Sequence, residues 1–430
     1  MGVLLADSIK LPCGAVLKNR IAKAAMTEGL ADARNRATGR HVTLYRRWAE
    51  GGAGLLITGN VMVDRRYLER PGNVAIDGPQ TDEAKAALEA LADAATEAGA
   101  AVWMQISHAG RQSPKAVAAE PVGPSAVPLR LPGGQFAAPR ALSPSEIENV
   151  IARFAHAALT AKAAGFTGVQ IHAAHGYLIS EFLNPLANRR EDQWGGPLEN
   201  RARLLMRVVG AVRAKVGSGF PVSVKLNSSD FQKGGFSFDD CLQVIEWLNG
   251  AGIDLLEITG GNYEQPSMMG FEGVEPVFEE SVRASTRARE AYFIRYAEKA
   301  ANVARMPLMV TGGFRTRAAM EEALASGAAD VIGLARPLCV DPDLPARLLS
   351  GAAGAPAWEA TLRLGPGYFG PNSPNDIIKA LNGFGAMAFF YENLYRLADG
   401  KETKRRMALL PAFIKFQAGE ARAAKALVGR

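Results

Sequence analysis

Short apolar runs alternate along the chain with longer segments in which apolar positions recur at helical spacing. Continuously apolar runs of this kind predict strands that are buried on both faces. The amphipathic segments between them, such as 82–100 and 147–165, predict helices. Several helical segments end in a glycine that favours helix termination, at Gly99, Gly165, Gly252 and Gly327. The strand-like runs occupy residues 20–26, 54–59, 101–107, 168–172, 221–227, 254–259, 307–313 and 330–335.

Eight alternations of strand and helix predict an α/β fold with a parallel sheet covered by helices. We expect this sheet to close into a (β/α)8 TIM barrel. The alternative is a doubly wound sheet, which typically carries a glycine-rich fingerprint after its first strand. The first run here is not followed by that fingerprint, whereas glycines follow the seventh run, at Gly312 and Gly313.

One connection is much longer than the others. Residues 108–146 form a segment rich in proline and glycine after the third run. A connection of this length commonly acts as a lid or a substrate wall, and a surface loop without a role is the alternative. The segment closes on a predicted helix start, with Ser143 as the N-cap and Pro144 and Glu146 in the first turn.

The end of the chain departs from the repeat. We assign residues 1–350 to the barrel and residues 351–430 to a linker followed by a C-terminal helical extension. The aromatic-rich segment 384–401 predicts a helix that packs on the barrel or on a neighbouring subunit, as in a homo-oligomer.

Composition narrows the class of protein. Hydrophobic residues make up 48% of the chain and charged residues 21%, which is ordinary for a globular protein. Cys13, Cys241 and Cys339 lie far apart, so their spacing predicts neither disulfides nor a zinc or iron–sulfur site, and it suits a reducing cytoplasm. The N-terminus lacks a signal-peptide pattern, and no apolar run reaches the roughly 18 residues of a membrane span.

The net charge of +6 is concentrated at one end. From Lys401 onward there are eight basic and two acidic residues, and 8 − 2 = +6, so residues 1–400 are formally neutral. Because the body of the chain has no basic face or recognisable module, we do not expect nucleic acid binding. The tail is interpreted as a solvated basic helix, with a weak contact to acidic partners or to a membrane surface as the less favoured alternative.

The stretch 171–182 (IHAAHGYLISEF) holds the strongest candidate chemistry. It places His172, His175 and Tyr177 where the fourth strand of a barrel ends, on the rim that carries function in this fold. An HxxH pair without a third ligand is a weak zinc signal, so we expect no metal site. A pair of histidines that merely bonds backbone groups is a second alternative.

Several motifs together resemble the Old Yellow Enzyme family of FMN-dependent NAD(P)H:flavin oxidoreductases, or ene-reductases. They occur in the family order over about residues 1–350, and the extension is not accounted for by the family pattern. The motif segments are 19–32, 103–112, 171–201, 224–231, 310–314 and 330–337.

The resemblance implies a role for each matching position. The backbone of Ala24, Ala25 and Met26 would lie beside the flavin ring. Thr27 would bond the flavin C4 carbonyl, Gly59 would lie against the ring edge, and Gln105 would bind the pyrimidine edge. Lys225, where relatives often have arginine, would place a cation near flavin N1 and O2. The phosphate would bind at Gly312, Gly313, Ala335 and Arg336, although alanine replaces the common glycine at 335 and does not easily adopt a positive φ.

The same resemblance implies a reaction. His172 and His175 would donate hydrogen bonds to the carbonyl or nitro oxygen of a small unsaturated substrate, and Tyr177 would protonate its α carbon. NADH or NADPH would supply the hydride through FMN. His108 and Arg111 would support the rim, and the polar residues of 184–201 would lock the loop after Tyr177.

Two other functions remain open from the sequence. One is a specialised oxidoreductase on the same barrel, such as an enzyme that demethylates amines. The other is a flavin-binding module without turnover, for which a proton donor such as Tyr177 would be unnecessary. The walls of the substrate pocket are expected in 108–146, 262–290 and the aromatic tail, and the sequence does not identify the substrate.

Overall fold

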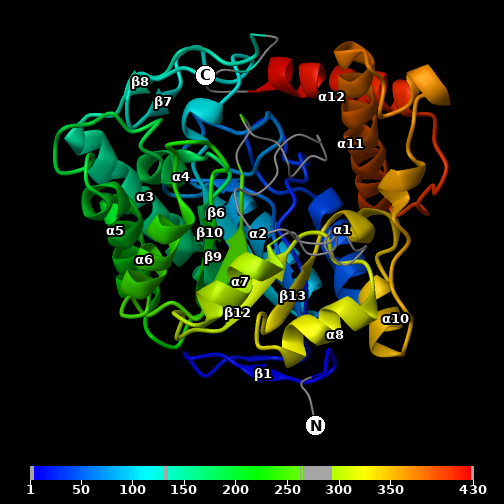
Figure 1. Cartoon of the computed structure of the whole chain (residues 1–430), viewed down its shortest axis with the longest axis horizontal. Coiled ribbons are helices and arrows are strands. Elements are labelled where there is room, and N and C mark those ends of the chain that lie inside the picture. Colours follow the sequence, from blue (N-terminus) through cyan, green and yellow to red (C-terminus); the bar gives the residue numbers. More distant parts are fainter. Residues whose placement is uncertain (1–3, 130, 132–133, 262–263, 265–292, 428–430) are drawn as a thin grey trace.

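The computed structural model describes residues 4–129, 131, 134–261, 264 and 293–427. Its centre is a closed ring of parallel strands, in which β4 pairs with β6 and the other strands follow in chain order (Figure 1). This is the (β/α)8 barrel that the hydrophobic pattern predicts, with one strand at each of the eight runs. The strands are β3 (Ile21–Lys23), β4 (Leu55–Ile57), β6 (Ala101–Ser107), β9 (Gly168–Ala173), β10 (Val222–Asn227), β11 (Leu255–Thr259), β12 (Leu308–Thr311) and β13 (Val331–Leu334).

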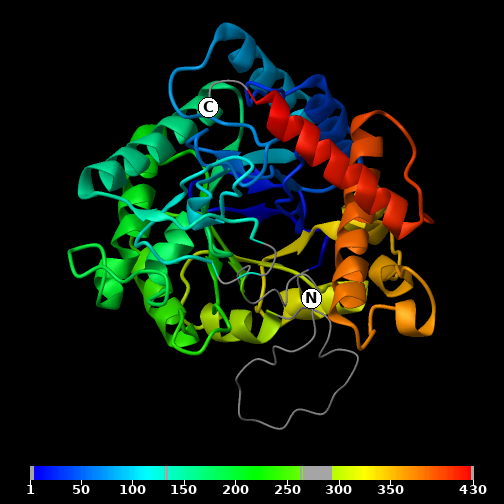
Figure 2. The same ribbon diagram turned by 90° about the horizontal axis from the view of Figure 1, so that it is seen from above.

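Helices surround the barrel, as the view along it shows (Figure 2). The predicted start of α3 (Pro144–Ala163) is confirmed, because Ser143 accepts from the backbone of Glu146 in a capping box. The four glycines expected at helix ends all have positive φ, between 71° and 85°. The other helices of the barrel are α1 (Gly39–Glu50), α2 (Asp82–Thr96), α4 (Leu178–Leu183), α5 (Leu198–Val216), α6 (Phe238–Leu248), α7 (Ile294–Ala301), α8 (Arg317–Ala325), α9 (Arg336–Val340) and α10 (Leu344–Leu349).

A short hairpin of β1 (Ile9–Lys10) and β2 (Val16–Leu17) closes the amino-terminal end of the barrel (Figure 1). Its apolar side chains join a cluster inside the barrel that includes Trp103 and Met309, so the barrel interior is filled by side chains. Three further short strands lie outside the ring, namely β5 (Val61–Met62), β7 (Val122–Gly123) and β8 (Arg140–Ala141). The last two pair within the long connection 108–146, which also contains the 3-10 turn Gly110–Gln112.

The C-terminal extension packs on its own barrel. After the turns Trp358–Thr361 and Gly367–Phe369, helix α11 (Asp376–Ala398) packs against α1 and α9, and α12 (Leu409–Ala426) packs against α11. Seen from above, α12 crosses the outside of the rim (Figure 2). None of the helices in the described part of the chain is long and apolar enough to cross a membrane.

Candidate active site

The residues that the sequence singles out come together at one end of the barrel. Each lies at or near the carboxyl end of a strand or in the following loop, and in a parallel barrel these ends form one rim. Of the expected pocket wall 262–290, the structure describes Glu264 alone, and the rest lies outside the described residues. The residues at this rim are Ala24, Ala25, Met26, Thr27, Gly59, Gln105, His172, His175, Tyr177, Lys225, Gly312, Gly313, Ala335 and Arg336.

His172, His175 and Tyr177 form a compact cluster. The His172 ring centroid lies 5.1 Å from that of His175 and 4.8 Å from that of Tyr177, both edge to face. Nδ1 of His172 accepts a hydrogen bond from the Ala174 backbone at 3.2 Å, so the proton of a neutral ring is on Nε2. Nε2 of His175 lies 2.9 Å from the Thr259 hydroxyl. Among the described residues, no group of three or more metal-binding side chains is placed to hold an ion.

Both histidines are neutral in this environment. Burial, and next the positive charge of Lys225, hold the pKa of His172 and the pKa of His175 well below the usual value for histidine. A neutral imidazole has a single N–H to donate. The pair can therefore supply two uncharged donors near a fixed cation.

The backbone of His175 is held in a conformation that few non-glycine residues adopt, with φ at 63°. Its N–H donates to Oδ1 of Asn227 at 3.1 Å, and its carbonyl accepts from Nε2 of Gln112 at 3.0 Å. These two bonds fix the turn that carries the second histidine and Tyr177 onto the rim.

Lys225 belongs to a buried polar chain that crosses four strands. Its Nζ lies 2.8 Å from Oε1 of Glu257, and the two side chains are 5% and 0% exposed. Glu257 also accepts from Nε2 of Gln170 at 2.9 Å, and Gln170 in turn accepts from Nε2 of Gln105 at 2.7 Å. Glu257 and Gln170 are not among the residues predicted from the sequence, although each is a polar residue inside an otherwise apolar strand.

The segment after β3 lies on the same rim. Ala24 is fully buried and its N–H donates to the carbonyl of Leu334 at 2.8 Å, which ties the segment to β13. Ala25 and Met26 are partly exposed on the rim. The Met26 sulfur lies 3.6 Å from the Cys339 sulfur of α9.

Gly59 packs closely against the segment that follows β3. A Cβ at Gly59 would come within 2.4 Å of both the Met26 carbonyl oxygen and Oε2 of Glu28, so a larger residue would displace this segment. The Gly59 N–H donates to Oε1 of Glu28 at 2.9 Å, and Tyr45 donates to the same oxygen. Lys23, fully buried, donates to the carbonyl of Ile57 at 2.5 Å, and burial lowers the pKa of Lys23 to about 8.

The Thr27 hydroxyl has a partner that the sequence did not indicate. It donates to Oε2 of Glu69 at 2.7 Å, and Asn60 donates to the same oxygen at 2.7 Å. A hydroxyl has one hydrogen to give. A bond from Thr27 to a flavin carbonyl therefore requires the hydroxyl to turn away from Glu69.

The ends of strands β12 and β13 carry groups that suit an anion. Gly312 and Gly313 have φ of 119° and 81°, and such turns bring backbone N–H groups close to a ligand. Ala335, which replaces the common glycine, has φ of −122°, so it does not incur the cost of a positive φ. Arg336 follows it with an exposed side chain whose guanidinium lies 6.0 Å from the Phe390 ring.

His108 and Arg111 lie near the rim with different contacts. Arg111 pairs with Glu264 at 2.9 Å, and its N–H donates to Glu181 at 2.8 Å. His108 packs on Tyr67 with ring centroids 5.3 Å apart, and burial lowers the pKa of His108 to about 4. Both residues therefore contact the loops of the rim rather than the His172 cluster.

The comparison with known families shows to which family the chain belongs. The model of the NADH:flavin oxidoreductase / NADH oxidase family matches residues 9–354. The chain belongs to this family. It is therefore an oxidoreductase whose cofactor is FMN, and the match ends before α11 and α12 begin.

Relatives of this flavin oxidoreductase include fungal proteins. An NADH-dependent flavin oxidoreductase (iliE) of Hypocrea jecorina is 39% identical over 353 residues, covering 78% of this chain and 86% of the relative. A protein of the same description from Neonectria is 38% identical, but the chain spans 46% of its length. An Old Yellow Enzyme homologue of Zymomonas mobilis has a similar structure, with a TM-score of 0.67, 29% identity and coverage of 82% and 94% of the two chains.

The donors at the rim of this flavin oxidoreductase fit FMN. A carboxamide and a buried cation, Gln105 and Lys225, lie on one side of the rim, and suit the polar pyrimidine end of the cofactor. Glycines with positive φ lie on the other side and suit a phosphate. Ala25 and Met26, which are partly exposed, follow β3, and this strand lies between the strands that carry these two groups.

Proposed function

We propose that this flavin oxidoreductase reduces the activated C=C bond of small α,β-unsaturated carbonyl or nitro compounds, with a reduced nicotinamide as hydride donor. The observation that carries the proposal is the cluster of two neutral, buried imidazoles and one phenol, in which the His172 ring lies 5.1 Å from that of His175 and 4.8 Å from that of Tyr177. NADH is favoured as the donor, because the fungal relatives are described as NADH-dependent.

In this proposal the rim residues hold FMN in the roles that the family resemblance implies. FMN supplies the group that accepts hydride from the nicotinamide and gives it to the β carbon of the acceptor. The backbone of Ala24, Ala25 and Met26 supports the ring, and Gln105, Lys225, Thr27 and Gly59 surround its polar end. Gly312, Gly313, Ala335 and Arg336 hold the phosphate.

His172 and His175 hold the acceptor by its oxygen. Nε2 of His172 carries the proton, because Nδ1 accepts from Ala174. In the proposed arrangement the Thr259 hydroxyl donates to Nε2 of His175, which leaves the His175 proton on Nδ1. Two N–H donors on one oxygen stabilise the negative charge that develops there as the β carbon receives hydride.

Tyr177 completes the reduction by protonating the α carbon. Tyr177 is 4% exposed and is the N-cap residue of helix α4. This position fixes its phenol beside His172. A buried phenol placed close to a developing carbanion is a suitable general acid. Lys225 lies near enough to shift the pKa of both imidazoles, so its charge also favours the anionic oxygen.

The visible spectrum and the turnover of the purified protein test the proposal. We expect a yellow protein that releases FMN on denaturation and oxidises NADH when cyclohexenone is added. A colourless protein that FMN does not reconstitute would exclude it. A protein that binds FMN but reduces no enone or nitroalkene would be a flavoprotein of another specificity.

The Tyr177→Phe variant tests the proton donor. For an enone whose α carbon needs enzymatic protonation, we expect kcat to fall roughly 10²-fold or more, the usual contribution of general acid catalysis. Reduction of the bound flavin by NADH should stay unchanged, because that half of the reaction does not involve Tyr177. Stopped-flow measurement of the two half-reactions separates these outcomes. An unchanged oxidative half-reaction would remove Tyr177 from the proposed role.

A further inference from the structure

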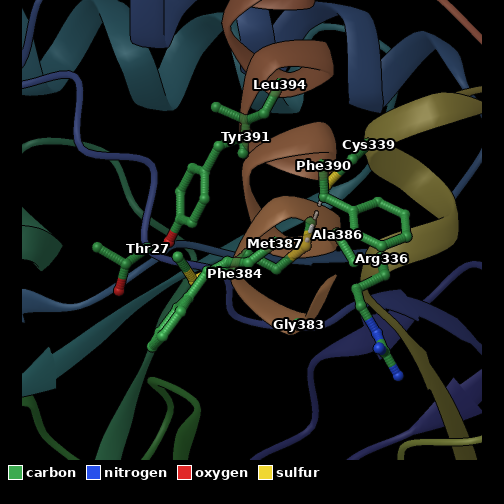
Figure 3. A pocket seen from close by; sticks show the side chains of 11 residues that line it. Thr27, Arg336, Cys339, Gly383, Phe384, Ala386, Met387, Phe390, Tyr391 and Leu394 are labelled. Carbon is green, nitrogen blue, oxygen red and sulfur yellow. Dashed lines mark hydrogen bonds between the residues drawn. The ribbon is translucent and has the colours of Figure 1, made fainter. Parts of the chain in front are cut away.

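An apolar cavity of about 250 Å³ lies between the strand-end rim and the C-terminal extension (Figure 3). Its barrel side is formed by Met26 and Thr27 after β3 and by Arg336 and Cys339 of α9. Its other side consists entirely of α11 residues, which lie outside the part of the chain that the family model matches. These residues are Gly383, Phe384, Ala386, Met387, Phe390, Tyr391 and Leu394.

The α11 side of the cavity is one continuous helix face. Phe384, Met387, Tyr391 and Leu394 follow one another at spacings of three and four residues, which places them on the same side of a helix. Phe384 and Arg336 both extend toward the lower part of the view, and their side chains diverge from the two sides of the cavity (Figure 3). Helix α11 lies next to the segment assigned to the phosphate, because the Arg336 guanidinium lies 6.0 Å from the Phe390 ring.

The residues that line the cavity indicate which end of FMN it can bind. FMN has a polar pyrimidine end and an apolar dimethylbenzene end. Gln105 and Lys225, the groups assigned to the pyrimidine end, are not among the described residues that line the cavity, and neither are His172, His175 and Tyr177. The cavity therefore lies away from Gln105 and Lys225 and from the acceptor-binding cluster. It lies beside three residues assigned to the cofactor, Met26, Thr27 and Arg336, of which Thr27 alone is assigned to the polar end.

We propose that α11 forms the apolar wall against the dimethylbenzene edge of FMN, so that the C-terminal extension is part of the flavin site. This inference rests on the cofactor roles assigned under the proposed function. The volume is sufficient, because an apolar cavity of about 150 Å³ is enough to bind benzene. Met387 and Phe384 supply the contact, and Met26 and Cys339 close the cavity on the barrel side.

The wild-type protein reconstituted with 8-chloro-FMN tests the proposal without a mutation. An external thiolate displaces chloride from C8 of this analogue wherever C8 is open to solvent. If α11 covers this edge, the bound analogue should react far more slowly than the free one. Burial raises the pKa of Cys339 to about 12, so the protein supplies no competing thiolate from within the cavity.

The Met387→Ala variant tests the contact itself. We expect FMN to bind the FMN-free protein roughly tenfold more weakly, the effect of losing one or two buried methylene-sized groups. Thiolate should also react faster with the bound 8-chloro analogue. The matched control is Ile377→Ala on the same helix, where the side chain is 71% exposed, and this variant should behave as wild type. Flavin fluorescence on binding gives the dissociation constants.

Three outcomes would overturn the inference while leaving the proposed function standing. One is a bound 8-chloro analogue that reacts as fast as free flavin. A second is a Met387→Ala variant with unchanged FMN affinity and unchanged C8 reactivity. A third is unchanged FMN affinity together with weaker turnover of bulky acceptors alone, which would assign the cavity to the acceptor. A protein that binds no FMN at all would instead refute the proposed function.

Discussion

Lys225 and Glu257 face each other on neighbouring strands, and neither side chain is more than 5% exposed. Taking both charges out of water is costly, and the pair persists because Gln170 also bonds the carboxylate. In the proposed cofactor site the carboxylate would weaken the field of the lysine at the flavin. The ion pair would therefore give bound FMN a lower reduction potential than an unpaired lysine would.

The Glu257→Gln variant tests this effect. It keeps the shape and, through its single amide oxygen, one of the two acceptor contacts, but it removes the negative charge, so the reduced, more negative flavin should become more stable. We expect the midpoint potential of bound FMN to rise by about 30 mV if the change is worth one power of ten in the two-electron equilibrium. Reductive titration against a reference dye measures it. Glu246→Gln on the exposed face of α6 is the control, and an unchanged potential in Glu257→Gln would contradict the prediction.

At the residue scale, the sequence predicted where the site residues lie better than it predicted their hydrogen-bond and ion-pair partners. His172, His175, Tyr177 and Lys225 were placed on the rim because they follow apolar strands, and the structure brings them together. The partner of Thr27 was not predictable, because Glu69 lies in a loop whose path depends on packing far along the chain. Glu257 was predictable in principle, since a carboxylate in a buried strand needs a cation nearby.

At the scale of elements, long apolar runs and helix caps were sufficient to locate the barrel. All eight runs became strands, because each is long enough for its burial to decide its conformation. The β1–β2 hairpin was missed, since two-residue strands show no periodicity. The position of α11 was left open between the barrel and a neighbouring subunit, because its aromatic residues fit either surface.

Arg70 is the residue that fixes the extension most directly. It is buried, pairs with Glu420 of α12 at 2.6 Å, donates to the Tyr395 hydroxyl at 3.0 Å and lies 4.4 Å from the Tyr391 ring. Replacing it leaves the Glu420 carboxylate without its cation. We therefore expect Arg70→Met to lower the free energy of unfolding by roughly 3 kcal/mol and to loosen α12.

Urea unfolding and amide hydrogen exchange of α12 measure the effect of Arg70→Met. The matched control is Arg46→Gln, which breaks an ion pair with Glu97 whose side chains are 48% and 68% exposed. Such surface pairs contribute little, so the control should change stability by less than about 1 kcal/mol. Equal effects of the two variants would mean that the extension does not depend on Arg70.

Across the whole molecule, burial shifts the pKa of several side chains that titrate near neutrality. It raises the pKa of Glu181 to about 8 and that of Asp230 to about 7, and it lowers the pKa of four imidazoles, to about 4 for His108. Below about pH 6.5 the unfolded chain therefore binds protons on His108, His172 and His175 that the native protein lacks, and His41 adds to this difference, while the native protein keeps two protons on its carboxyls. The four imidazoles are those of His41, His108, His172 and His175.

The net difference is at least 3 − 2 = 1 proton, to which His41 adds, so stability falls as pH drops below about 6.5, by roughly 1–3 kcal/mol per pH unit. Between about pH 6.5 and 8 the two carboxyls dominate, so stability also falls as pH rises, and Lys23, whose pKa is lowered to about 8, opposes this fall only as pH approaches 8. The FMN-free protein should therefore be most stable near pH 6.5, as measured by urea unfolding at about pH 5.5, 6.5 and 8. His108→Gln should reduce the loss on the acid side by about 1 kcal/mol per pH unit and leave the basic side unchanged. A stability that climbs steadily over this range would mean that the buried imidazoles are not held neutral.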